Sequence, residues 1–396
     1  MGKQNSSAKA LLLTVLSLIL FTPPTLRAEN KITEKGKAPS LFETIWNSPK
    51  LYKNKDNPYI QDFSLIGRYH GQYWVSDSDG NRENDWENRR FYFGFNARLF
   101  RQFTVELQMN ANENFDPFYK NLYDAFIKWQ PPETKFEISV GRLDYVYTGM
   151  ERSTSSKKIA TMERALLVNQ IMPGEVVGVY SKGKEGDLSY QAGLFSGSIE
   201  DEFTQFDGGF GALIGVAYTA PLFYKSGTLH LDYLYNDGDP ANNAFKPYEN
   251  ILTLWHRGQS GPAAMGIDLT FADGTDGISD LFGLTLLPTY DFAHNIFISN
   301  DMLQLALRYH FASSSDDHGI NLAKRYEQEV ATGEGDSYNS FYAGLNYYLY
   351  GNKMKLMAGL EYWDMDNIGD GSSTDSSEVK TSANGWTFIS GIRLYF

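Results

Sequence analysis

The chain ends in the segment WTFISGIRLYF, residues 386–396, which alternates apolar side chains with polar or small ones up to an aromatic terminus. Successive side chains of a β-strand point to opposite faces, so one face of this segment is apolar: Trp386, Phe388, Ile392, Leu394 and Phe396. Its other face is compatible with water: Thr387, Gly391, Arg393 and Tyr395. One face for hydrocarbon and one for water is typical of a strand in a transmembrane β-barrel. Phe396 also resembles the terminal aromatic that the barrel-assembly machinery of bacterial outer membranes reads, so we expect that machinery as a partner.

The amino-terminal end has the layout of a secretory signal peptide. Two lysines precede an apolar stretch at residues 10–21, and a Pro-Pro pair and a Leu-Arg-Ala site at 26–28 follow it. The apolar stretch of about twelve residues is shorter than the roughly 20 that a helix needs to cross a bilayer. No later segment is longer or more apolar. We therefore expect a signal peptide over residues 1–28 and membrane spans built from strands.

The composition agrees with strands as the spanning elements. Aromatic residues make up 15% of the chain, yet the mean hydropathy is −0.39, as expected of strands that are apolar only at alternate positions. The absence of cysteine excludes disulfides and thiolate metal sites. The formal charge is −13, and removing the three basic residues of the signal peptide makes it −16. A nucleic-acid partner is not expected, because binding nucleic acid requires a basic face.

Sixteen segments of strand length can be marked from residue 63 onward, and the clearest alternate with a period of two. They are residues 63–76, 88–99, 103–112, 120–130, 135–142, 175–183, 188–198, 209–220, 227–237, 249–257, 262–272, 279–290, 301–312, 338–350, 353–363 and 384–396. Single-chain bacterial barrels have an even number of strands, which this count satisfies. The alternation is weakest in four of these segments: 175–183, 249–257, 262–272 and 279–290.

The lengths of the connections separate a barrel from its main alternative, a β-sandwich. Every second connection is long: 77–87, 113–119, 143–174, 199–208, 238–248, 273–278, 313–337 and 364–383. The connections between them are short, apart from 291–300. Short turns on one rim and long loops on the other are typical of outer-membrane barrels, whereas a sandwich has no reason to segregate them. The sequence thus predicts an all-β fold, a transmembrane antiparallel β-barrel of about 16 strands over residues 63–396.

Residues 29–62 precede the predicted barrel and do not alternate. Three prolines lie among lysines and asparagines in this segment, and a short helix is predicted around residues 41–46. We interpret it as a periplasmic amino-terminal extension. It is far too short to be the plug domain of a large receptor barrel.

The third long loop, residues 143–174, is the candidate for a pore constriction. It has 32 residues, and we expect it to fold inward. A hydroxyl residue at Ser155 and apolar residues at helical spacing predict a short helix over 155–167. Such a helix would bring a group of basic side chains near the pore axis: Arg152, Lys157, Lys158 and Arg164.

This loop also carries a family resemblance. The runs VGRLD at 140–144 and ERSTSSKKIATMER at 151–164 resemble the phosphate-selective porin O and P family. In that family a strand ending in glycine leads into a loop with a Ser-Ser pair and a Met-Glu-Arg triplet. The resemblance implies a sixteen-stranded, trimeric outer-membrane channel for phosphate or related anions. The chain departs from the family pattern at Val146-Tyr147, where a Pro-Phe pair is usual, and at Thr161, where an aromatic is usual. The fold and the channel role therefore carry over, and phosphate selectivity does not.

At the positions predicted to face the barrel interior, basic residues slightly outnumber acidic ones. These basic residues include Arg68, Arg90, Arg98 and Arg308, whereas the negative excess lies mainly in the long outer loops. A dedicated anion pore would carry a ring or ladder of basic residues at its constriction. The sequence thus predicts a channel for small hydrophilic solutes, with weak to moderate preference for anions such as phosphate.

Other functions remain as alternatives. A structural or adhesin-type barrel without an open pore would share the same pattern, and only conductance separates the two. An outer-membrane enzyme is disfavoured, because His70 and His310 have inward parity and the six histidines have no ligand spacing. We expect no catalytic residue, no metal site and no cofactor. The expected surroundings are outer-membrane lipid and lipopolysaccharide, which the acidic loops could bridge through divalent cations.

Overall fold

The computed structural model describes residues 40–144, 146–200, 202–220, 224–316, 319–322, 326–331, 333–368 and 381–396. The chain divides into two compact units, Met1–Thr44 and Ile45–Phe396. Helix α2 (Leu41–Asn47) confirms the helix predicted around residues 41–46. Its first turn has a capping box, in which the Glu43 N–H donates to Ser40 Oγ (3.1 Å) and the Ser40 N–H donates to Glu43 Oε2 (2.7 Å). No helix in the described part of the chain is long and apolar enough to cross a membrane.

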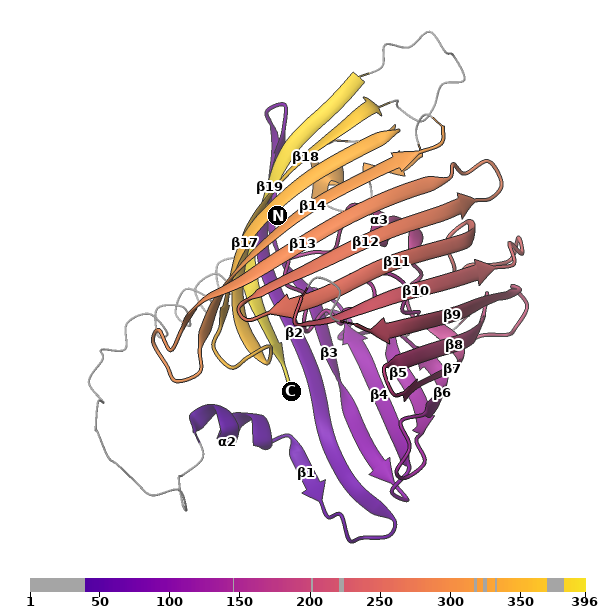
Figure 1. Ribbon diagram of the computed structural model, residues 1–396, viewed down its shortest axis with the longest axis vertical. Helices are drawn as coiled ribbons and strands as arrows, with labels where there is room; N and C mark the ends of the chain where they lie inside the picture. Colours follow the sequence, from indigo (N-terminus) through magenta and orange to yellow (C-terminus); the bar gives the residue numbers. More distant parts are fainter. Residues whose placement is uncertain are drawn as a thin grey trace. The chain divides into compact units, whose positions relative to one another are not determined.

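The second unit contains a closed, antiparallel barrel of sixteen strands, in which each strand pairs with the next and the last pairs with the first (Figure 1). The barrel strands are β2 (Ile60–Ser78), β3 (Asn81–Leu99), β4 (Phe103–Ala111), β5 (Tyr119–Trp129), β6 (Glu137–Leu143), β7 (Val176–Glu185), β8 (Leu188–Ser196), β9 (Phe210–Thr219), β10 (Ser226–Asn236), β11 (Tyr248–Ser260), β12 (Ala263–Gly274), β13 (Leu281–His294), β14 (Met302–Ser314), β17 (Ser337–Tyr348), β18 (Met354–Ile368) and β19 (Thr381–Tyr395). Each corresponds to one predicted segment, so the predicted fold class and strand count are confirmed.

Three short strands lie outside this ring. Strand β1 (Lys50–Lys53) pairs with the beginning of β2, where Lys53 lies opposite Asp62. Strands β15 (Ile320–Asn321) and β16 (Glu334–Gly335) form a separate two-stranded sheet in the connection between β14 and β17. That connection therefore has local structure of its own.

The predicted loop at 77–87 is wrong. Strands β2 and β3 continue through this region and pair up to Ser78 opposite Asn81. The connection is a two-residue turn at Asp79 and Gly80, whose φ angles of 52° and 82° fit a tight hairpin. The hairpin tip is polar on both faces, so it has no alternation from which a strand could be predicted.

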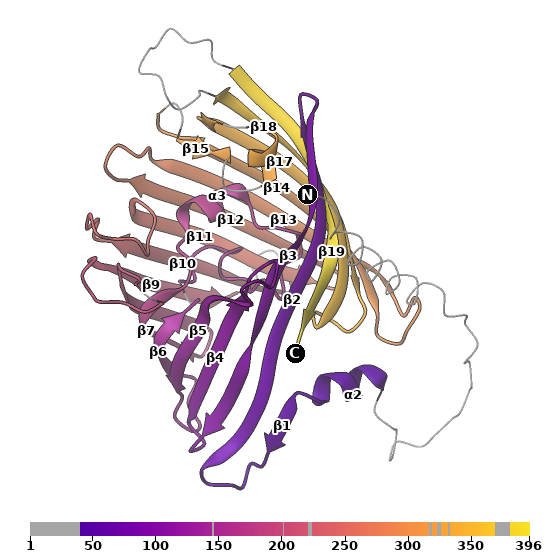
Figure 2. The same ribbon diagram turned by 180° about the vertical axis from the view of Figure 1, so that it is seen from behind.

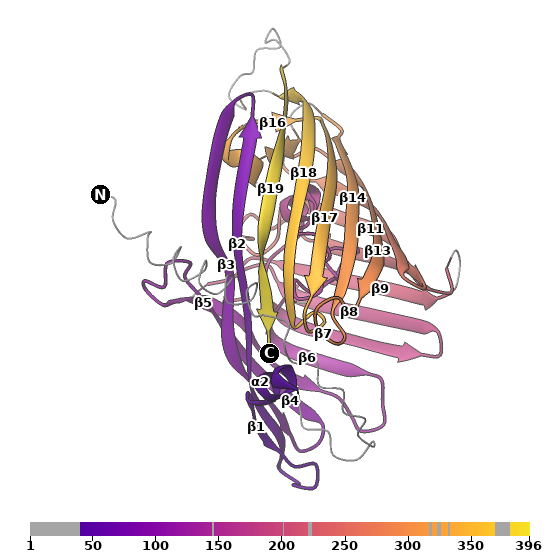
Figure 3. The ribbon, with the colours of Figure 1, turned by 90° about the vertical axis from the view of Figure 1, so that its left-hand side faces the viewer.

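The carboxyl terminus closes the barrel against β2. Strands β19 and β2 are aligned with Phe388 opposite Val75, and Figure 3 shows β2 and β3 beside β19 and β18. Phe396 and Gly67 exchange two backbone hydrogen bonds of 3.1 Å. A Cβ atom on Gly67 would lie 2.5 Å from the Phe396 ring. The Phe396 ring thus packs directly against the backbone of Gly67, in space that any larger residue would fill.

Filling the space above Gly67 should reduce insertion of the barrel, which we also expect of a deletion of Phe396. In Gly67→Leu the added side chain displaces the Phe396 ring, which we expect to lower the yield of heat-modifiable barrel in the membrane while export is retained. Gly174→Ala is the matched control, because no heavy atom lies within 4 Å of a Cβ placed there. Normal yield of barrel from both Gly67→Leu and the Phe396 deletion would contradict a role of the terminal ring in assembly.

Candidate functional site

The connection between β6 and β7 lies inside the barrel. Figures 1 and 2 place its helix α3 (Leu166–Ile171) within the ring of strands from opposite viewpoints. Several of its side chains are completely buried: Val146, Thr148, Met150, Met162, Ala165 and Leu166. The third long loop therefore folds inward, as its length suggests.

The helix predicted over 155–167 is wrong, because only Leu166–Ile171 is helical. In the preceding segment, the backbone carbonyl oxygens accept hydrogen bonds from side chains of the barrel wall instead of from helical N–H groups. These bonds are Lys355 Nζ to Ile159 O (2.6 Å), Asn346 Nδ2 to Ala160 O (2.8 Å), Arg393 Nη2 to Met162 O (2.9 Å) and Arg308 Nη1 to Glu163 O (2.8 Å). Since the wall binds these carbonyls, the segment is held along the wall in a non-helical conformation.

Two acidic residues of the loop bind arginines of the wall. Arg308 on β14 bridges Glu151 of the loop and Glu361 of β18, with N–O distances of 2.9 Å to each. All three side chains are at most 4% exposed. Arg308 therefore has the inward position expected from its parity, yet its charge is neutralised and shielded from solute.

The second pair involves Arg89, which strand periodicity assigns to the lipid face. The β2–β3 register passes from His70 opposite Arg90 to Gly71 opposite Asn88, which leaves Arg89 as the extra residue of a β-bulge. A bulge re-aims a side chain. The Arg89 guanidinium thus lies on the inner side of the wall, where it contacts Glu163 of the inward loop. Its Nε is 3.0 Å from Glu163 Oε1 and its Nη2 is 3.3 Å from Oε2. No pattern in the sequence signals this bulge.

Glu163 is ionised in this environment. Burial alone would raise the pKa of its carboxyl, but the guanidinium groups of Arg89, Arg90 and Arg393 outweigh burial and hold the pKa well below its usual range. Its Oε1 also accepts a hydrogen bond from Gln72 Nε2 (3.1 Å). The loop is therefore fixed to β2 and β3 by a charged contact that persists at any physiological pH.

The predicted constriction residues do not form a single cluster. Arg152 and Arg164 line a cavity of about 250 Å³ together with Arg90. Within it, Arg152 forms an ion pair with Asp144 at 2.6 Å. Arg164 donates to the carbonyl oxygens of Glu151 and Thr154 (both 2.9 Å). Burial, with Arg152 and Arg90 nearby, lowers the pKa of Arg164 to about 10, so it remains cationic at neutral pH.

Arg90 is the least compensated cation of this cavity. Its Nη1 atom is buried and has no hydrogen-bond partner among the described residues. Within the described part of the chain, neither Arg90 nor Arg164 forms an ion pair. The acids that line the same cavity, Asp144 and Glu175, each have an arginine within 4 Å. The cavity thus keeps a positive excess.

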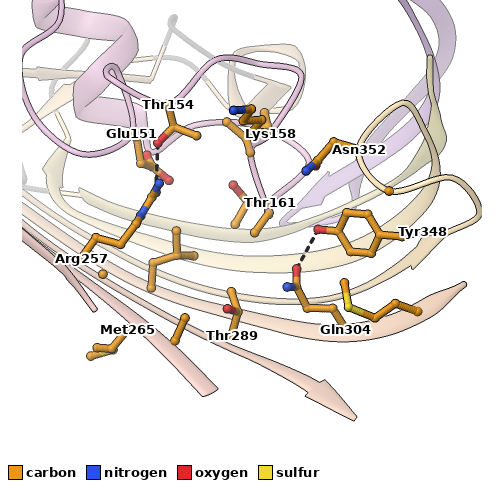
Figure 4. A pocket seen from close by; sticks show the side chains of 17 residues that line it. Glu151, Thr154, Lys158, Thr161, Arg257, Met265, Thr289, Gln304, Tyr348 and Asn352 are labelled. Carbon is orange, nitrogen blue, oxygen red and sulfur yellow. Dashed lines mark hydrogen bonds between the residues drawn. The ribbon is translucent and has the colours of Figure 1, made fainter. Parts of the chain in front are cut away.

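Lys158 lines a different cavity, of about 300 Å³, with Arg257 from the facing wall (Figure 4). Figure 4 shows the loop residues Glu151, Thr154 and Lys158 on one side of this space. The opposite side carries Met265, Thr289 and Gln304 of the wall. Arg257 Nη2 donates to Thr154 Oγ1 at 2.9 Å, so the wall also holds the loop here.

The other predicted residues lie apart from both cavities. Lys157 Nζ sits 5.1 Å from the ring centre of Tyr395. Arg68 donates to Ser156 Oγ (2.7 Å). Arg98 donates to the carbonyl oxygen of Arg101 at the turn (2.8 Å).

Lys157 gives the channel a predicted pH response. Burial first, and Arg68 and Lys158 in addition, lower its pKa to about 8, against the opposing effect of Glu106 and Asp124. A lysine is cationic below its pKa, so raising the pH from 7 to 9 removes one positive charge from the lumen. We expect anion preference, measured as a reversal potential in a salt gradient, to fall over this interval.

Lys157→Gln is the control for this pH response. At pH 7 this variant should prefer anions less than the wild type does. Its anion preference should then not change between pH 7 and 9. The same fall in Lys157→Gln as in the wild type would show that another group titrates.

The comparisons with known proteins agree with this architecture. A search among curated proteins gives no match. The model of the family "Phosphate-selective porin O and P" matches residues 63–248, which include the whole inward loop. The chain is an outer-membrane porin, similar over residues 63–248 to the phosphate-selective porins O and P. The predicted resemblance and the outer-membrane location are confirmed.

Solved porins share the fold of this porin. OmpF of Salmonella typhi, solved with daunomycin, has a TM-score of 0.57 at 13% identity, covering 88% of this chain and 100% of that one. The anion-selective porin from Comamonas acidovorans has a TM-score of 0.54 at 12% identity, covering 84% and 99%. The trimer form of OmpT of Vibrio cholerae has a TM-score of 0.51 at 12% identity, also covering 84% and 99%. At this level of identity the likeness concerns the fold.

Proposed function

We propose that this porin passes small hydrophilic solutes with weak to moderate preference for anions such as phosphate. The observation that carries the proposal is the positive excess of the cavity beside the inward loop, where Arg90 and Arg164 have no acidic partner among the described residues. Sixteen-stranded porins leave an aqueous channel, in which such charges act on passing ions. The constriction residues in this proposal are Arg152, Lys157, Lys158 and Arg164.

The net negative charge of the chain does not oppose this proposal. The acidic residues concentrate in the long loops and in the hairpin tip around Asp79. Charges farther away than the Debye length of about 10 Å at 0.1 M salt are largely screened. The nearby arginines therefore outweigh the distant carboxylates at the loop.

Reversal potentials of single channels in a salt gradient test the proposal. The wild type should prefer anions, and Lys157→Glu combined with Lys158→Glu should shift the reversal potential toward cations. Arg98→Glu, which changes a charge near the turn at Arg101, should shift it less. A cation-preferring wild type, or a double variant with unchanged selectivity and conductance, contradicts the proposal.

A barrel that passes no solute is the alternative, and one observation favours it. Apolar residues of α3 pack in one buried cluster with residues of the β14–β17 connection: Leu166, Leu167, Ile171, Ile320, Leu322 and Val330. This cluster fills part of the lumen on the long-loop side. Absence of any conductance from folded, reconstituted protein would support the closed barrel.

We further propose that the porin acts as a homotrimer without catalytic activity. The trimer form of Vibrio cholerae OmpT, which has the same fold, supports the oligomeric state. The histidines considered for catalysis are held by the fold: His70 and His310 are each 1% exposed, and His310 Nδ1 is bonded to Thr285 Oγ1 (3.0 Å). Analytical ultracentrifugation in detergent tests the trimer.

A further inference from the structure

A third cavity, of about 500 Å³, lies between the inward loop and the wall formed by β6 to β11. Its volume is within the range of roughly 300–1,000 Å³ that small-molecule sites occupy. Tyr147 and Ser153 contribute from the loop, and His230, Asp232 and Trp255 contribute from β10 and β11. It is larger than the two cavities described above, of about 300 and 250 Å³. Its lining also differs from theirs in chemistry.

A rigid pair of aromatic rings forms one wall of this cavity. The rings of His230 and Trp255 are stacked, with centroids 3.4 Å apart and planes 10° apart. Trp255 Nε1 donates to Asp232 Oδ2 at 2.7 Å, and the indole packs with Met150 and Leu287 in a small buried cluster. Trp255 is fixed and covers one face of the partly exposed His230 ring. On the neighbouring strand β9, the residue opposite His230 is Ala217, which is small and lines the same cavity.

Polar groups beside these rings are fixed in position by a hydrogen-bond network. Gln191 Nε2 donates to Asp232 Oδ1 (2.9 Å) and to the carbonyl oxygen of Tyr147 (2.8 Å). Tyr180 OH donates to Gln191 Oε1 (2.8 Å). Ser153 Oγ is buried in the same lining and has no hydrogen-bond partner among the described residues. Amide, carboxylate and hydroxyl groups are thus arranged before any solute arrives.

The acidic groups of this cavity are compensated. Glu137 lies 3.2 Å from Lys182 and 3.6 Å from Lys128. Asp232 is bonded to Trp255 and Gln191. Two further lysines of the lining are exposed: Lys135 and Lys184. An anion finds no cluster of arginines here, and a purely apolar solute would leave the polar groups unpaired.

A ligand that fits both features has a flat C–H face and many hydroxyl groups. The C–H face of a pyranose ring covers an aromatic ring, while its hydroxyls exchange hydrogen bonds with amide and carboxylate groups. We propose that this cavity is a binding subsite for neutral sugars of one or two rings, with His230 as the stacking platform and Gln191 as a hydrogen-bond partner. The inference extends the proposed channel function, since the sugar would be a second class of solute on the opposite side of the same loop.

Titration calorimetry on the full-length, detergent-solubilised protein tests the subsite with maltose and with inorganic phosphate as separate probes. His230→Ala removes the ring on which the sugar would stack, so it should weaken maltose binding by roughly one order of magnitude, as loss of a stacking ring does for nucleobases. The ratio of maltose affinity to phosphate affinity should fall by the same factor. His230→Phe keeps a ring face and should keep maltose binding within about threefold, whereas Gln191→Ala should weaken it.

The outcomes separate the subsite from the channel. Heat-modifiable migration first establishes that each variant is folded, and Gln191→Ala supplies the loss of binding to be tested if His230→Ala does not fold. No maltose binding by the wild type, wild-type affinity for maltose in the folded His230→Ala and Gln191→Ala variants, or direct competition between maltose and phosphate would overturn the subsite. Conductance in potassium chloride is measured separately. Its absence contradicts the proposed channel and leaves the calorimetric result on sugar binding intact.

Discussion

Arg308→Met is expected to release the inward loop and to lower the free energy of unfolding by about 3–5 kcal/mol, the cost of leaving a buried charge without its partner. Arg308 joins Glu151, Glu361 and the carbonyl oxygen of Glu163, and its side chain has no exposed surface. Methionine fills similar volume but leaves two buried carboxylates unpaired. The loop then loses the contact that ties it to β14, so single-channel conductance should rise and become noisier.

Denaturant unfolding of the reconstituted barrel and single-channel recording measure this effect. Arg98→Met is the matched control, because Arg98 bonds only to the Arg101 carbonyl oxygen in the described structure. Adding Glu151→Gln and Glu361→Gln to Arg308→Met should recover part of the stability, since it removes the unpaired charges. Wild-type stability and conductance in Arg308→Met would show that the buried pair does not hold the loop.

The strands of this porin can be predicted from the sequence because each must serve two solvents. Lipid selects apolar side chains on one face and the lumen tolerates polar ones on the other, so Phe388 and Thr387 in β19 already indicate their faces. The signal disappears where the strand leaves the bilayer. For this reason the hairpin around Asp79 resembles a loop in the sequence, although its strands are paired to the tip.

The sequence predicts where the inward loop lies, but it does not predict the conformation of the loop backbone. Its helical spacing at 155–167 is a local pattern, whereas its backbone is set by side chains distant in sequence. Lys355 and Arg393, for example, bind the carbonyls of Ile159 and Met162. These bonds exist only once the barrel has closed, so no window of sequence contains them.

The same limit applies to Arg89, which strict strand periodicity would place on the lipid face. A β-bulge shifts parity by one residue, and periodicity counted from Arg90 cannot detect the shift. The consequence for function is large, because Arg89 neutralises an acid of the inward loop. The charge beside β3 in the lumen therefore depends on Arg89, a residue that strand periodicity alone would not place in the lumen.

Arg89→Leu and Glu163→Gln are expected to shift ion selectivity in opposite directions. Arg89 Nε lies 3.0 Å from Glu163 Oε1, and the side chain of Arg89 is 35% exposed while that of Glu163 is 6% exposed. Removing the guanidinium leaves a negative charge at the loop, and removing the carboxylate leaves a positive one. A unit charge about 10 Å from a passing ion changes its energy by roughly 1 kcal/mol at an effective dielectric constant of about 30–40, which is a factor of about five in permeability ratio.

Reversal potentials in a salt gradient should therefore move toward cations in Arg89→Leu and toward anions in Glu163→Gln, with the double variant close to the wild type. Arg101→Leu is the matched control, because Arg101 lies in the exposed turn between β3 and β4. Both single variants shifting in the same direction would mean that the loop has moved, which a change in single-channel conductance would reveal. No shift in either variant would place Glu163 outside the path of ions, and the selectivity would then depend on the other basic residues of the loop and the wall.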